Sequence, residues 1–133
     1  YGPARTALMV ELASTQYRRG VETDRALAAQ AGIPVVHVWQ PQPLAKQPHA
    51  ADDELYRRLD FDPSQLPRTT ADYTAIRKGS GVAPIDLTHV LDDVMVPVFF
   101  DSSHTNELGA RTVATALYGQ IRPELVQLDA GRQ

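Results

Sequence analysis

The residues of this chain best suited to chemistry are Asp101 and His104, which follow an apolar run over 96–100. We expect a strand over 96–100 and a helix over 105–121, and reactive groups collect beyond the carboxyl ends of strands in open α/β sheets. A three-residue step across such a turn can bring the Asp101 carboxylate to Nδ1 of His104. Nε2 would then be free to take a proton from a hydroxyl nucleophile, as in the base half of a catalytic triad.

The same spacing recurs at Asp86 and His89, so spacing alone is weak evidence. The segment 86–94 has apolar residues spaced as on one face of a helix: Leu87, Val90, Leu91 and Val94. An aspartate at the start of a helix is an ordinary capping residue, and we expect His89 to be a surface or partly packed histidine. Asp101 has this capping interpretation too, with Glu107 complementing the dipole of the following helix.

Further elements must position the pair. We expect a helix over 4–31 that ends at Gly32, a buried strand over 33–39, a loop-rich excursion over 41–84 and a helix over 86–94. The excursion carries six prolines and has room for short helices at 52–59 and 70–78. Alternation of helices and strands predicts an α/β fold with a parallel sheet. Two strands are too few, because open sheets normally have about four to six, so we expect the chain to be part of a domain.

Composition excludes several classes of function. The chain has 133 residues, with 13 basic and 16 acidic side chains and a net charge of -3, which gives no footprint for nucleic acid or for an anionic membrane surface. The absence of cysteine excludes disulfides, thiolate metal sites and a cysteine nucleophile. No motif for a cofactor is found. No signal peptide and no apolar run of roughly 20 residues is visible, and the compartment stays open.

The segment 98–110, with its Asp-x-x-His step and Gly109 in the next helical turn, resembles the last signature block of SGNH (GDSL-type) hydrolases. Segments 31–41 and 85–88 are similar to the joins that precede it in that family. The resemblance implies a three-layer, flavodoxin-like α/β fold, of which residues 1–133 would form the C-terminal part. It also implies ester or acyl hydrolysis, in which Asp101 orients His104 and His104 acts as general base. The family includes exported and cell-envelope proteins.

The other half of such a site is not recognisable. The family's nucleophilic serine lies in a Gly-Asp-Ser block, and its further oxyanion donors lie in a glycine block and a Gly-x-Asn block. Asn106 comes after the base and does not replace the family's asparagine. Gly79-Ser80-Gly81 follows a polar helical segment instead of a strand, so it predicts a loop and not a nucleophile elbow. We therefore expect residues 1–133 to be inactive alone, and to act with the N-terminal half of the domain or another copy on a small ester or an acylated carbohydrate or lipid.

Two other hypotheses remain open at this level. The chain could be a non-catalytic binding or assembly module with a related α/β fold. A metal site could also use the carboxylates and imidazoles of both Asp-x-x-His steps, whose ligand types suit zinc or manganese. Nothing in the sequence brings Asp86 and His89 to Asp101 and His104, so no residue is predicted to bind a metal.

Overall fold

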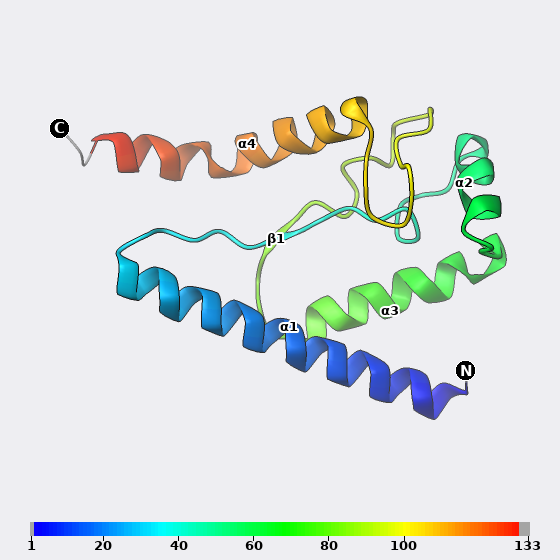
Figure 1. Cartoon of the computed structure of the whole chain (residues 1–133), viewed down its shortest axis with the longest axis horizontal. Coiled ribbons are helices and arrows are strands. Elements are labelled where there is room, and N and C mark those ends of the chain that lie inside the picture. The colour runs from blue at the N-terminus through cyan, green and yellow to red at the C-terminus, as the bar shows by residue number, and fades with distance from the viewer. Residues whose placement is uncertain (1, 131–133) are drawn as a thin grey trace.

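The computed structural model describes residues 2–130, which are mostly helical, with 61% helix and 5% strand. Two helices, α1 and α4, lie on opposite sides of the segment that contains β1 (Figure 1). The elements in chain order are α1 (Pro3–Ala31), β1 (Val38–Trp39), the 3-10 turn η1 (Ala50–Asp52), α2 (Asp53–Arg58), the 3-10 turn η2 (Pro63–Gln65), α3 (Leu66–Gly79), β2 (Ile85–Asp86) and α4 (Glu107–Ala130). None of the described helices combines the length and apolarity needed to cross a membrane.

The expected three-layer flavodoxin-like α/β fold is wrong. The described residues contain one sheet of two short parallel strands, in which Val38 is opposite Ile85 and Trp39 is opposite Asp86. Parallel strands are stable where further strands flank them and helices cover both faces. The segment 33–36 has no neighbouring strand, and 96–100 pairs only through one bridge at Phe99, so neither extends the sheet.

The helix α1 spans the range expected for it. Gly32 ends it with φ at 65°, a left-handed conformation that suits glycine, and donates its N–H to the carbonyls of Ala28 and Ala29. Gly20 lies within the helix without breaking it. α1 packs against α3, and the approach at Gly79 is so close that a Cβ there would lie 2.9 Å from Oγ of Ser14.

The expected helix over 86–94 is absent: Asp86 ends β2, and residues 88–93 form consecutive turns. The Asp86 carboxylate accepts hydrogen bonds from both the N–H and the hydroxyl of Thr88, at 3.0 and 2.6 Å. Such local side-chain bonds offer the backbone an alternative to a helix. Leu87 and Leu91 are nevertheless buried. The apolar spacing thus correctly predicted that these side chains are buried, but the helix predicted from it was wrong.

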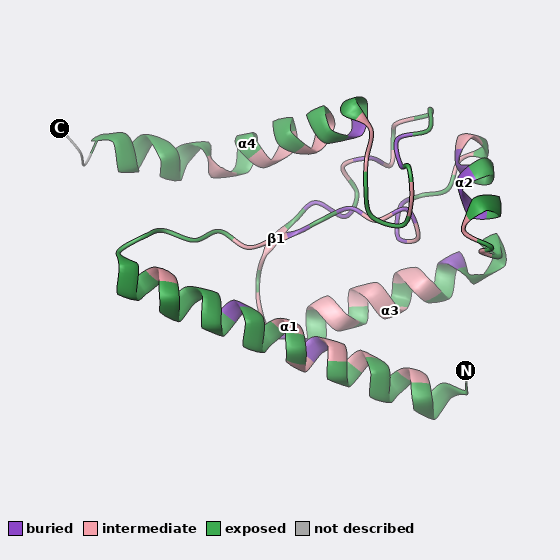
Figure 2. Ribbon diagram, in the orientation of Figure 1, coloured by how far each residue is buried: buried purple, intermediate pink, exposed green. Residues whose placement is uncertain are grey.

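The strand expected over 96–100 is reduced to a single antiparallel bridge between Phe99 and Thr105. The last helix runs on to Ala130, with Pro123 inside it, although Pro123 was expected to help end it. One cluster of buried core residues consists of Leu55, Leu91, Val98 and Phe99, with partly buried neighbours around it. This core anchors the chain on both sides of the loop 100–104. Figure 2 shows that α1 and α4 are exposed along most of their length.

Candidate active site

The loop 100–104 is closed at its base and fixed to the core. The N–H of Phe100 donates to the carbonyl of His104 at 2.8 Å, next to the Phe99–Thr105 bridge. Asn106 then fastens the start of α4, because its N–H donates to the carbonyl of Val98 at 2.8 Å. Its side-chain amide donates to Pro97 O at 2.8 Å and its side-chain oxygen accepts the N–H of Gly109 at 3.0 Å. Asn106 is thus the N-cap of α4, a common role for asparagine.

Inside this loop the Asp101 carboxylate is held by three hydrogen bonds of 2.8 Å. Oδ1 accepts hydrogen bonds from the backbone N–H groups of Ser103 and His104, and Oδ2 accepts one from Nδ1 of the His104 ring. The backbone bond from His104, followed by the bond from its ring and that from Ser103, holds the pKa of Asp101 well below its usual range. The carboxylate is therefore ionised at neutral pH.

The His104 ring lies at the surface, with its side chain 78% exposed. A carboxylate accepts hydrogen bonds only, so Nδ1 of the neutral ring is assigned the proton. Within residues 2–130 no hydrogen bond reaches Nε2 of His104. This nitrogen keeps an accessible lone pair, which is the requirement for a general base.

A shallow groove of about 340 Å³ runs beside the pair. It lies between the residues after β1 and the first turns of α4, and Ser103 and Thr105, which flank His104 in the chain, are part of its wall. Its full lining consists of Gln40, Pro41, Ser103, Thr105, Ala110, Val113, Ala114 and Leu117. The α4 side of the groove is apolar, so it suits a hydrocarbon group better than a charged one.

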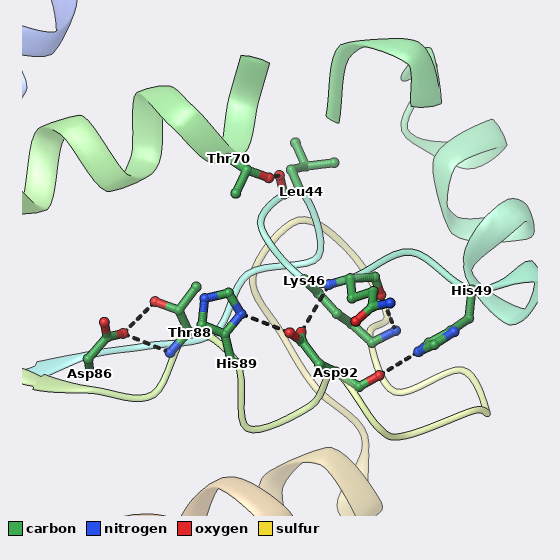
Figure 3. A network of polar contacts seen from close by, with 9 residues as sticks. Leu44, Lys46, His49, Thr70, Asp86, Thr88, His89 and Asp92 are labelled. Carbon is green, nitrogen blue, oxygen red and sulfur yellow. Dashed lines mark hydrogen bonds and ion pairs between the residues drawn. The ribbon is translucent and has the colours of Figure 1, made fainter. Parts of the chain in front are cut away.

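The second Asp-x-x-His step does not form a pair. His89 turns away from Asp86 and places Nδ1 2.8 Å from Oδ2 of Asp92 (Figure 3). Asp86 instead bonds to Thr88 and lies 3.1 Å from the Arg77 guanidinium. Asp92 was not expected as the partner of His89, although the His-x-x-Asp spacing over 89–92 has the same three-residue step.

The contacts of Asp92 give it a structural role. Its Oδ1 accepts the N–H of Gln47 at 2.9 Å, and its carbonyl oxygen bonds to Nε2 of His49 (Figure 3). The same loop contains a buried ion pair, in which Nζ of Lys46 lies 2.6 Å from Oδ2 of Asp52. Asp92 thereby fastens the loop 46–52 to the turns over 86–94. The Asp101–His104 pair makes no such link between distant segments, and its ring is left open to solvent.

The remaining candidates do not add to the pair. Ser80 is fully buried at the end of α3, where its hydroxyl donates to the carbonyl of Arg77 at 2.6 Å, so it is not a poised nucleophile. Across residues 2–130, no three or more histidine, aspartate or glutamate side chains gather as a metal site would require. The four residues of the metal hypothesis therefore stay in separate groups.

Comparison with known proteins gives no relative: no family model, no curated protein and no solved structure matches the chain. The likeness of segment 98–110 to SGNH hydrolases stays a prediction from the motif.

Proposed function

We propose that this chain supplies the general-base half of an ester or acyl hydrolase. Asp101 orients His104, and His104 takes the proton from the attacking hydroxyl. The observation that supports this most is the 2.8 Å contact between Oδ2 of Asp101 and Nδ1 of His104, on a ring whose Nε2 is exposed. A carboxylate in this position selects the tautomer and stabilises the imidazolium formed during the reaction.

In the proposed reaction a hydroxyl nucleophile attacks the ester carbonyl while its proton moves to Nε2 of His104. The imidazolium then returns the proton to the leaving alcohol as the tetrahedral intermediate collapses to an acyl-enzyme. Water attacks the acyl group in the second half of the cycle, with His104 again as the base. The nucleophile and the oxyanion donors come from a polypeptide segment outside residues 1–133.

The groove beside the pair supports an ester with an apolar acyl or alcohol group as substrate. Its apolar wall is formed by Val113 and Leu117 of α4, with two alanines between and beside them. A small ester, or an acylated carbohydrate or lipid, would place its hydrocarbon portion there. Ser103 and Thr105, the neighbours of His104 in the chain, contribute to the wall of the same groove.

A second candidate is a non-catalytic assembly module, which the extensive exposed apolar surface favours. The two functions differ in what they require of His104. An assembly module needs the fold but not the imidazole, whereas a hydrolase needs both.

The test is ester hydrolysis by residues 1–133 assembled with the nucleophile-bearing segment. His104→Ala should lower kcat by about 10²–10⁴-fold, the usual contribution of a general base, and Asp101→Asn should lower it less. His89→Ala is the matched control, because His89 is 69% exposed and has the same 2.8 Å contact to a carboxylate. Its kcat should stay within about twofold of the parent, since it is not expected to touch substrate. Full activity of the His104→Ala variant would contradict the proposal.

A further inference from the structure

The chain exposes more surface than a compact protein of its size. Its accessible surface is 8981 Å², whereas a compact monomer of 14.6 kDa exposes about 6,900 Å². The excess of 8981 over about 6,900 is about 2,000 Å², and a stable interface buries about 800 Å² on each partner. The surface that remains open is therefore more than one ordinary interface requires.

One edge of this open surface is the free side of β1. The carbonyls of His37 and Trp39 accept the N–H groups of Ile85 and Leu87, so these two residues direct their backbone toward β2. Backbone groups alternate in direction along a strand, and those of Val36 and Val38 therefore point to the opposite edge. In this parallel register the bonds to β2 use His37 and Trp39, and within residues 2–130 no other backbone hydrogen bond reaches Val36 or Val38. Such an edge is a template for another strand.

The side chains on this segment are apolar and open. Ile33, Val35 and Val36 are exposed by 62%, 42% and 47%, respectively. Pro34 has no N–H, so it ends any ladder at the start of the segment and limits pairing to the stretch that includes Val36 and Val38. It therefore excludes registers in which Val38 would face Pro34 of the added strand.

The edge is complementary to itself. If two copies meet antiparallel around a twofold axis at His37, Val36 of each copy faces Val38 of the other, and each such pair exchanges two N–H···O bonds. The two His37 side chains then face each other across the axis. The His37 side chain is nearly buried, and its Nε2 lies 3.8 Å from Oδ2 of Asp24 in α1. The resulting sheet has four strands, in the order β2-β1-β1-β2, which reaches the usual size of about four to six.

We propose that the free edge of β1 binds a second copy of this chain through antiparallel pairing of Val36 and Val38. The pairing satisfies four N–H and four carbonyl groups that otherwise bond only to water. It also removes apolar surface of the exposed Val36 from water. The loop 100–104 takes no part in it, so this inference does not depend on the hydrolase proposal.

Sedimentation velocity of residues 1–133 at micromolar concentration tests the inference, together with hydrogen exchange at the Val38 amide. We expect a dimer in which this amide exchanges at least about tenfold more slowly than in Val36→Lys, because a charge on the edge blocks strand addition. Leu128→Lys is the matched control, since Leu128 is 44% exposed at the far end of α4. It should stay dimeric.

Three results would overturn the inference. The first is a monomer with a rapidly exchanging Val38 amide, which would leave the edge to another polypeptide or to water. The second is a dimer that persists in Val36→Lys, which would place the interface elsewhere. The third is dissociation of Leu128→Lys and Val36→Lys alike. Circular dichroism of both variants establishes that each retains its helices.

Discussion

Gly109, in the first turn of α4, is packed so closely that replacement by alanine should move the site. A Cβ at this position would lie 2.8 Å from Cβ of Thr105 and 3.2 Å from Cβ of Val98. Val98 is fully buried in the core and Thr105 is held by its bridge to Phe99, so neither can withdraw easily. The added methyl group must therefore displace the backbone next to His104.

The magnitude follows from two opposing effects. Overpacking a tight contact costs about 1–3 kcal/mol, whereas alanine in place of glycine inside a helix gains up to about 1 kcal/mol. We expect Gly109→Ala to lower the free energy of unfolding by about 1 kcal/mol. Gly119, in the same helix, has nothing within 4 Å of an added Cβ. Gly119→Ala should therefore gain up to about 1 kcal/mol.

Urea unfolding of the two variants measures this difference directly. Because the helix-propensity gain is common to both, the gap between them reports the crowding alone, about 1–3 kcal/mol. In thermal unfolding the gap corresponds to roughly 4–10 °C for a chain of this size. Equal stability of the two variants would refute the packing argument and, with it, the account of how the core holds the loop 100–104.

Two further predictions concern the rest of the fold. Lys46→Met should lower the free energy of unfolding by about 3–5 kcal/mol, because it leaves the buried Asp52 carboxylate without its cation. In urea unfolding, the double variant with Asp52→Leu should recover most of that loss. A Lys46→Met variant as stable as the parent would contradict this prediction. Burial, reinforced by the charges of Asp52 and Asp53, raises the pKa of Tyr56 to about 12, above the usual value near 10. The folded state thus keeps the phenol neutral while the unfolded chain ionises. Stability should be unaffected below pH 10 and fall between pH 10 and 12, and Tyr56→Phe should fall less steeply in that range.

Whether an expected helix or strand is present in the structure depends on where its backbone hydrogen bonds find partners. The long helix near the N-terminus could be predicted from its own residues, because a helix satisfies its backbone internally and Gly32 supplies a local end signal. The strands could not, because a strand needs a neighbour that the segment itself does not specify. The run 33–39 has the composition of a buried strand, yet only Val38 and Trp39 find a partner.

The candidate site was likewise predictable where it depends on neighbouring residues, and not where it depends on contacts between distant segments. Asp101 and His104 are three residues apart on one short loop, so local geometry is sufficient to bring them together. The difference between this pair and the Asp86–His89 step could not be read from spacing. It arises because Thr88 satisfies Asp86 locally and Asp92 is closer to His89, contacts that depend on the turns over 86–94.

Nitrogen-resolved NMR of the His104 imidazole, in residues 1–133 at pH 8, reports whether Asp101 orients the ring. The orienting carboxylate predicts that the neutral ring carries its proton on Nδ1 and leaves Nε2 unprotonated. In Asp101→Asn this preference should be lost, because an amide can present either a donor or an acceptor. A parent ring with its proton on Nε2, or a tautomer unchanged by Asp101→Asn, would contradict the assignment of His104 as a base oriented by Asp101.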